Sequence, residues 1–109
     1  MEKRGAKRKP VSLEAKLICN GKDYPAFIEN ISECGLHMIT ASKKSIMSFI
    51  PEMQLNLKFQ SPSGNKTDLY CEIRWVHINK TPIHGLTYRM GTEILEQPPE
   101  YMDFFNTLK

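Results

Sequence analysis

The chain has 109 residues, a formal net charge of +3 and 40% hydrophobic residues, values typical of one soluble globular domain. No apolar stretch approaches the ~20 residues of a membrane-spanning helix, and the basic N-terminus lacks the apolar core of a signal peptide. We therefore expect a cytoplasmic protein without a membrane segment, long enough to bury one core.

Positive charge is concentrated at the start of the chain. Residues 2–9 read EKRGAKRK, with five basic side chains and one acidic, and the remainder is close to neutral. This stretch contains one alanine and no larger apolar side chain, so it cannot contribute to a core. We predict a flexible basic arm over residues 1–9 and a folded domain over residues 10–109.

A hairpin is predicted next. From Val11 to Cys19 apolar and polar residues alternate with a period of two, and Asn20-Gly21 is the strongest two-residue hairpin signal. A second run, residues 22–31, completes the hairpin. With Asn20 and Gly21 as the loop, paired residue numbers sum to 41, so that Val11 faces Asn30. Extending this register places Arg8 near residue 33, with allowance for a bulge.

Three further stretches have the pattern of strands with one buried face. They are residues 53–60, 69–75 and 86–94, with turns predicted at 61–65 and 79–83. In the second stretch the period of two puts Trp75 on the buried face together with Leu69, Cys71 and Ile73. Short strands at this spacing indicate an all-β antiparallel barrel or sandwich.

The C-terminal segment has the pattern of a helix. Pro98 and Pro99 suit a helix start, and an apolar stripe follows at i, i+3, i+4 and i+7, consisting of Tyr101, Phe104, Phe105 and Leu108. We expect the stripe to pack on the barrel, with docking onto a partner as the alternative. Residues 41–51 allow two interpretations: a helical turn that covers one barrel end, or an exposed contact patch formed by residues 46–50.

The three cysteines point to neither a disulfide framework nor a metal site. Their number is odd, they are widely spaced at positions 19, 34 and 71, and no histidine completes a zinc-ligand spacing. Cys34 and His37 lie three residues apart but lack a third, orienting group, so a catalytic pair is not indicated. We expect no enzyme, no cofactor and no metal.

Two motifs meet at the open end of the predicted hairpin. One is R-G-A-K-R, with Arg4 and Arg8 four residues apart, and the other is N-I-S-E-C-G, containing Asn30, Ser32 and Gly35. An arginine fork can pair with guanine or phosphate, the carboxamide can read a base edge, and the hydroxyl can donate to phosphate. Glycine lets backbone N–H groups approach an anion. Together they describe a surface for a guanine nucleotide with more than one phosphate.

The same residues resemble those of PilZ domains. The arginine pair followed by Pro10-Val11 is similar to the R-x-x-x-R box of that family, and Asn30-x-Ser32-x-x-Gly35 to its [D/N]-x-S-x-x-G box. The stretch RWVHINKTPIHGLTYRMGTEIL resembles the closing strands. The resemblance implies a six-stranded antiparallel β-barrel with a C-terminal helix and a bacterial receptor for cyclic di-GMP.

By this resemblance, Arg4 and Arg8 grip guanine and phosphate, while Asn30, Ser32 and Gly35 form the opposing shelf. Binding orders the arm over the barrel and signals to an unidentified protein partner. Cys34 stands where many relatives have glycine or another small residue.

Two other functions remain open from the sequence. A small barrel with a basic arm could bind nucleic acid, which we regard as the weaker hypothesis because the aromatic residues are scattered. A PilZ-fold adaptor that binds protein and not nucleotide is the second, suggested by the apolar residues 46–50 and the aromatic helix.

Overall fold

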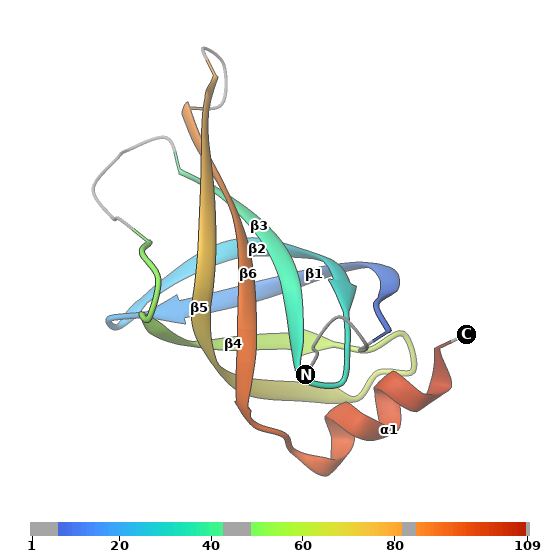
Figure 1. The fold of residues 1–109 in the computed structure, drawn as a ribbon. Helices are drawn as coiled ribbons and strands as arrows, with labels where there is room; N and C mark the ends of the chain where they lie inside the picture. Colours follow the sequence, from blue (N-terminus) through green and yellow to red (C-terminus); the bar gives the residue numbers. More distant parts are fainter. Residues whose placement is uncertain (1–6, 43–48, 82–84, 109) are drawn as a thin grey trace.

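The computed structural model describes residues 7–42, 49–81 and 85–108. Within them lie six strands and one helix (Figure 1), as the resemblance to PilZ domains implied. Their bounds are β1 (Lys9–Cys19), β2 (Lys22–Ile31), β3 (Gly35–Ser42), β4 (Gln54–Gln60), β5 (Lys66–Thr81), β6 (Gly85–Glu96) and α1 (Pro99–Thr107). The strands form one closed antiparallel barrel in the order β1-β2-β3-β6-β5-β4. In the described residues, α1 does not have the length or apolarity to cross a bilayer.

The core fills the inside of the barrel with the inward half of each alternating strand. Fully buried examples come from four different strands: Leu17, Ile28, Leu57 and Leu69. Each such aliphatic side chain contributes roughly 1.5–3 kcal/mol relative to an exposed one. The outward half of the same strands is left free to build a surface site.

The first hairpin follows the predicted register over most of its length. Asn20 and Gly21 have φ angles of 53° and 77°, as a tight turn between twisted strands requires. The numbers of paired residues sum to 41 from Cys19 to Leu13. A bulge then places two residues of β1 opposite one residue of β2. The predicted pairing of Val11 with Asn30 is therefore wrong: Asn30 faces Pro10.

A second bulge changes which side of the sheet Trp75 occupies. Ile73 pairs with Thr92 and Trp75 with Gly91, so Arg74 is the extra residue in β5. The prediction of a buried Trp75 is wrong because this insertion reverses the alternation, and its side chain is 40% exposed on the outer face. The predicted turn at 79–83 is wrong at its start, since β5 continues to Thr81; residues 82–84 lie outside the described residues.

Helix α1 packs on the barrel, as predicted. Pro99 occupies its first turn, and Tyr101, Phe104 and Phe105 are buried. The Phe104 ring lies 5.7 Å from that of Phe59 in β4. Because the aromatic stripe is already covered, the described structure does not support docking of this helix onto a partner.

The segment before β4 fits neither interpretation of residues 41–51 fully. Phe49 is buried with its ring 5.0 Å from Tyr88, while Ile50 is exposed, and neither is helical. Residues 43–48 lie outside the described residues, so the proposed apolar patch is represented here by Ile50 alone.

Candidate functional site

Arg8 and Asn30 meet on the outer face of the barrel. Arg8 lies one residue before β1, and its Nη1 donates to Oδ1 of Asn30 over 3.1 Å. The bulge in β1 shifts the pairing by one residue, so Arg8 is level with residue 32 instead of residue 33. This places Arg8 on the same face as Asn30, and its side chain reaches Asn30 diagonally. The two motifs of the sequence therefore lie side by side, joined through these two side chains.

The Asn30 carboxamide extends this contact to β3. Because Arg8 donates to its oxygen, its NH2 group faces His37, with Nδ2 3.2 Å from Nδ1 of the imidazole. Nδ1 then accepts a hydrogen bond, which requires that it carry no proton. The result is a polar chain, Arg8–Asn30–His37, that crosses β1, β2 and β3.

The surroundings of His37 favour its neutral form. Burial lowers its pKa from 6.5, the charge of Arg8 lowers it further, Glu29 raises it and Arg89 lowers it. Glu29 and Arg89 face each other across β3 in a two-point ion pair, with Nη2 3.1 Å from Oε2. Charged groups thus surround the imidazole on two sides.

Trp75 of β5 lies next to His37, on the side away from Asn30, and completes a row of three side chains across β2, β3 and β5: Asn30, His37 and Trp75. Its ring lies 5.2 Å from that of His37 in an edge-to-face arrangement. The indole rests on Gly91, where a β-carbon would sit 2.1 Å from Nε1 and 2.4 Å from Cε2. Gly91 pairs with both His37 and Trp75, and the absence of a side chain there leaves the space that the indole occupies. At about 4.8 Å between strands, the row from β2 to β5 is roughly 14 Å wide.

Ser32 is buried and builds the loop between β2 and β3. Its hydroxyl donates to the carbonyl of Gly35 over 3.2 Å and accepts from the backbone N–H groups of Cys34 and Gly35. Its own backbone carbonyl accepts from the Tyr101 hydroxyl at 2.5 Å. The hydroxyl therefore fixes the loop that follows Asn30, and it does not face the outer surface.

Gly35 is required for close packing of β3 against β6. A β-carbon there would lie 2.3 Å from the carbonyl oxygen of Thr92. Its N–H already bonds the Ser32 hydroxyl, so it is not available to an anion in this arrangement. The glycine of the second motif thus serves the geometry of the loop.

The described residues contain no group of three or more histidine, cysteine or acidic side chains arranged to hold a metal. Burial raises the pKa of Cys19 and raises that of Cys71 to about 12, so both remain thiols. Cys34 is exposed beside the loop, with its Sγ 3.8 Å from the Ser32 hydroxyl.

The structure divides the predicted site residues into two groups. Arg8 and Asn30 present polar groups at the surface, whereas Ser32 and Gly35 are buried supports of the loop. Arg4 lies outside the described residues. Sequence reasoning missed the row of His37 and Trp75, although a glycine at position 91 facing an aromatic residue across the strands was a usable signal.

With this geometry established, comparisons with known proteins give the family. The family model described as PilZ domain matches residues 2–105. The PilZ domain of YcgR from Escherichia coli, solved with c-di-GMP, has a TM-score of 0.74 and 10% identity, over 98% of this chain and 89% of that one. No curated protein matches this chain.

Two longer proteins contain the same fold. MotI, the inhibitor of motility from Bacillus subtilis, has a TM-score of 0.70 and 18% identity, over 94% of this chain and 47% of that one. MrkH of K. pneumonia in its apo state has a TM-score of 0.70 and 14% identity, over 98% and 49%. The chain thus spans about half the length of these two. The family match over nearly all of its residues shows that the chain belongs to the PilZ domain family.

Proposed function

We propose that this protein is a receptor for cyclic di-GMP and has no catalytic activity. The observation that carries the proposal is the Arg8–Asn30 contact, 3.1 Å long, on the outer face of a PilZ barrel. A guanidinium and a carboxamide are the two side-chain groups best suited to pair with base edges. Here they are held side by side and open to solvent on one side.

The ligand would take the place of the contact between these two side chains. The Arg8 fork can turn from Asn30 to guanine O6 and N7 or to a phosphate oxygen, since its partner is a single neutral amide. The carboxamide of Asn30 is then free to offer a donor and an acceptor to the edge of a base in the ligand. We assign to Arg4, outside the described residues, the remaining contact with phosphate.

Trp75 adds a stacking surface to this proposal. Its indole is 40% exposed and supported from below by Gly91 and at the side by His37. An aromatic face held in this way contributes about 1–3 kcal/mol per stacked base. The width of the row accommodates a base and a phosphate side by side.

The roles of Ser32 and Gly35 are indirect in this account. Their hydrogen bonds and close packing hold the loop after Asn30 in one conformation. They therefore determine where the carboxamide stands, and we do not assign them contacts with the ligand.

Known relatives support the ligand class. The YcgR domain was solved with c-di-GMP, and MrkH is described as a c-di-GMP dependence transcription regulatory factor. Ordering of the N-terminal arm over the barrel and signalling to a protein partner complete the proposal. The position of Arg8, one residue before β1, supports the first part of this proposal.

Calorimetric titration with cyclic di-GMP tests this function. We expect Arg8→Ala and Asn30→Ala each to weaken binding by roughly 5- to 150-fold, the equivalent of ~1–3 kcal/mol per bidentate contact. Lys7→Ala is the matched control, since it removes the same charge one residue away and should change affinity little. Equal affinity in the wild type and all three variants would show that Arg8 and Asn30 do not contact the ligand.

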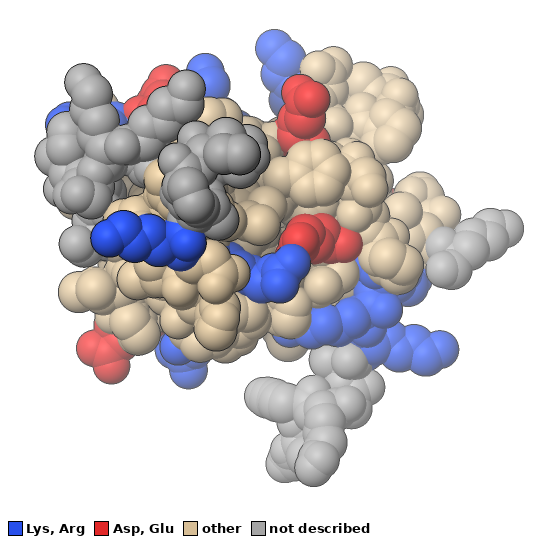
Figure 2. Space-filling view, turned by 90° about the horizontal axis from the view of Figure 1, so that it is seen from above, with Lys and Arg blue, Asp and Glu red and all other residues tan. Residues whose placement is uncertain are grey.

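The same titration separates nucleic-acid binding from this function. Nucleic-acid binding driven by phosphate contacts falls steeply with salt. On the face shown in Figure 2, several basic side chains of the described residues lie next to one another toward one edge, with an acidic side chain beside them. Tight binding of an oligonucleotide that cyclic di-GMP does not displace would favour the nucleic-acid hypothesis.

A further inference from the structure

The carboxamide of Asn30 can stand in two orientations, and the structure shows it in one of them. Its oxygen and its NH2 group are nearly equal in size, so a half-turn exchanges acceptor and donor without a steric cost. Here Oδ1 accepts from Nη1 of Arg8 over 3.1 Å, and Nδ2 lies 3.2 Å from Nδ1 of His37. The oxygen is therefore directed toward Arg8 and the NH2 group toward β3.

His37 is the residue that can keep this orientation when a ligand is bound. Under the proposed function Arg8 turns to the ligand, and the oxygen of Asn30 then loses its present partner. Among the described residues, the side chain of Asn30 bonds only Arg8 and His37. An imidazole with its proton on Nε2 can accept at Nδ1 from the NH2 group, but it cannot donate there to the oxygen. The reversed carboxamide would place its oxygen against the lone pair of Nδ1.

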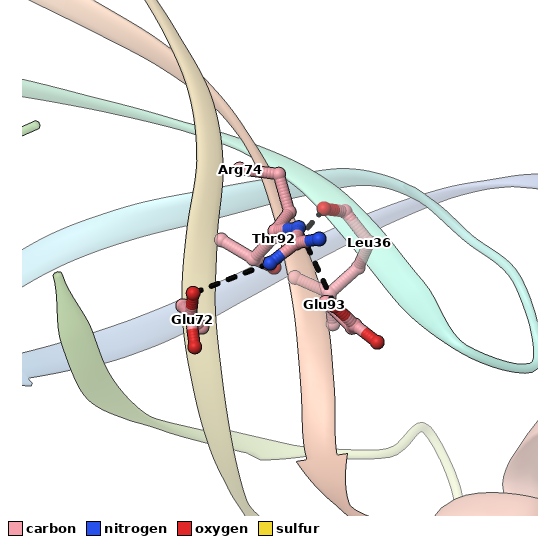
Figure 3. A network of polar contacts seen from close by, with 5 residues as sticks. All are labelled: Leu36, Glu72, Arg74, Thr92 and Glu93. Atoms are coloured by element: carbon pink, nitrogen blue, oxygen red, sulfur yellow. Dashed lines mark hydrogen bonds and ion pairs between the residues drawn. The ribbon is translucent and has the colours of Figure 1, made fainter. Parts of the chain in front are cut away.

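The position of the imidazole is restrained on both sides of its strand. The carbonyl of Leu36, the residue before His37, accepts from the Thr92 hydroxyl over 3.1 Å, which ties this part of β3 to β6 (Figure 3). On the side away from Asn30 the ring of Trp75 lies 5.2 Å from the imidazole. These contacts hold the ring where Nδ1 meets the carboxamide.

The bulge that brings Trp75 beside His37 has polar contacts of its own. Its extra residue, Arg74, contacts Glu72 of the same strand, with Nη1 3.2 Å from Oε2, and Glu93 of β6, with Nε 3.4 Å from Oε1 (Figure 3). Each exposed ion pair contributes little stability, but both restrain the same side chain at the bulge.

The two purine bases differ in the atoms that this orientation would meet. Guanine carries the acceptor O6 next to the donor N1–H, whereas adenine carries the donor N6–H2 next to the acceptor N1. When the fork of Arg8 binds O6 and N7 of a guanine, the next group along its edge is N1–H, which needs an acceptor. The oxygen of Asn30, on the side of Arg8, is such an acceptor. The reversed carboxamide would offer a donor, which suits N1 of adenine.

We infer that His37 is a positioning residue that makes the site selective for guanine, because its hydrogen bond from Asn30 keeps the carboxamide oxygen directed at the base. The inference rests on the proposed function and adds which base the same site accepts. His37 acts through Asn30 in this account and has no assigned contact with the ligand.

Selectivity between cyclic di-GMP and cyclic di-AMP tests the inference. The two ligands carry the same charge, so the ratio of their dissociation constants cancels charge effects common to both. His37→Leu has no acceptor, and we expect the preference for cyclic di-GMP to fall by about 5-fold or more, the lower end of the discrimination by one oriented pair. His37→Asp has only acceptors and should keep the wild-type ratio, although its charge should weaken binding of both ligands. His77→Leu, which removes an exposed imidazole from β5, is the matched control and should also keep the ratio.

An unchanged ratio in His37→Leu, or an equal decrease in His37→Leu and His37→Asp, overturns the inference and leaves the receptor function standing. A wild type that does not bind cyclic di-GMP contradicts the receptor function itself.

The protonation of the imidazole gives a second test that does not depend on the weaker ligand. Two-bond 1H–15N spectra report which nitrogen of His37 carries the proton. We expect the proton on Nε2 and an unprotonated Nδ1, both in the free protein and in the complex with cyclic di-GMP. A proton on Nδ1 in the complex overturns the inference.

Discussion

The indole of Trp75 lies against Gly91 so closely that a β-carbon at residue 91 would sit 2.1 Å from its Nε1. The contact holds the partly exposed indole beside His37, which is in turn hydrogen-bonded to Asn30. Trp75 is the single tryptophan of the chain, so its environment can be observed directly.

Gly91→Ala should displace the indole into solvent. A methyl group has no room in this position, and the crowding should cost roughly 1–3 kcal/mol of stability. We expect the fluorescence emission of Trp75 to shift to longer wavelength. Gly35→Ala is the control, because its β-carbon meets the Thr92 carbonyl instead. It should destabilise the barrel without this spectral change, and equal spectra for Gly91→Ala and the wild type would contradict the contact.

Trp75→Ala should weaken binding of cyclic di-GMP. The loss of one base stack predicts a decrease equivalent to ~1–3 kcal/mol in calorimetry. Tyr70→Ala removes an aromatic side chain of nearly equal exposure, 39% against 40%, from the same strand. It should leave affinity unchanged, so a similar loss in both variants would argue against a specific stacking role.

Ser32→Ala should loosen the loop that carries Asn30. The fully buried hydroxyl accepts from the backbone N–H groups of Cys34 and Gly35 and donates to the Gly35 carbonyl. Removing it leaves the buried N–H of Gly35 without this partner, at a cost of about 1–3 kcal/mol. Chemical denaturation measures the loss. Cys34→Ser, two residues away and exposed, should change stability by less than about 0.5 kcal/mol. A neutral Ser32→Ala variant would show that the loop does not depend on this hydroxyl.

The pKa of His37 should lie below 6.5 and respond to its charged neighbours. Arg8→Ala removes a charge that lowers this pKa and should raise it, whereas Glu29→Gln should lower it further. Imidazole proton shifts in NMR measure both changes. Because the folded-state pKa is lowered, the unfolded chain binds the proton more readily, so stability is full above pH 6.5 and decreases as pH falls below it. A measured His37 pKa of 6.5 that neither substitution changes would show that burial and these charges do not act on the imidazole.

Much of the fold could be predicted from the chain alone. The Asn20-Gly21 turn and the alternation on either side of it fixed the first hairpin down to the pairing of Cys19 with Lys22. The helix was predictable because prolines mark its start and its stripe has a period that no strand shares. These signals are local, so they survive without knowledge of the rest of the molecule.

The bulges could not be predicted, and they changed the site. A single extra residue at Arg74 moves Trp75 from the core to the surface, and another in β1 brings Arg8 to Asn30. Assigning faces from the alternation of apolar and polar residues assumes an uninterrupted strand. After a bulge, this assignment gives the wrong face of the sheet for every later residue. The buried roles of Ser32 and Gly35 likewise depend on contacts with Tyr101 and Thr92, more than 50 residues away.

The most direct test of the central claim is an NMR titration of the wild-type protein with cyclic di-GMP, observing side-chain N–H signals. The account predicts that the carboxamide of Asn30, the guanidinium of Arg8 and the indole N–H of Trp75 shift together with one saturation curve. Saturable binding that leaves these three signals unchanged, or no binding at all, would contradict it.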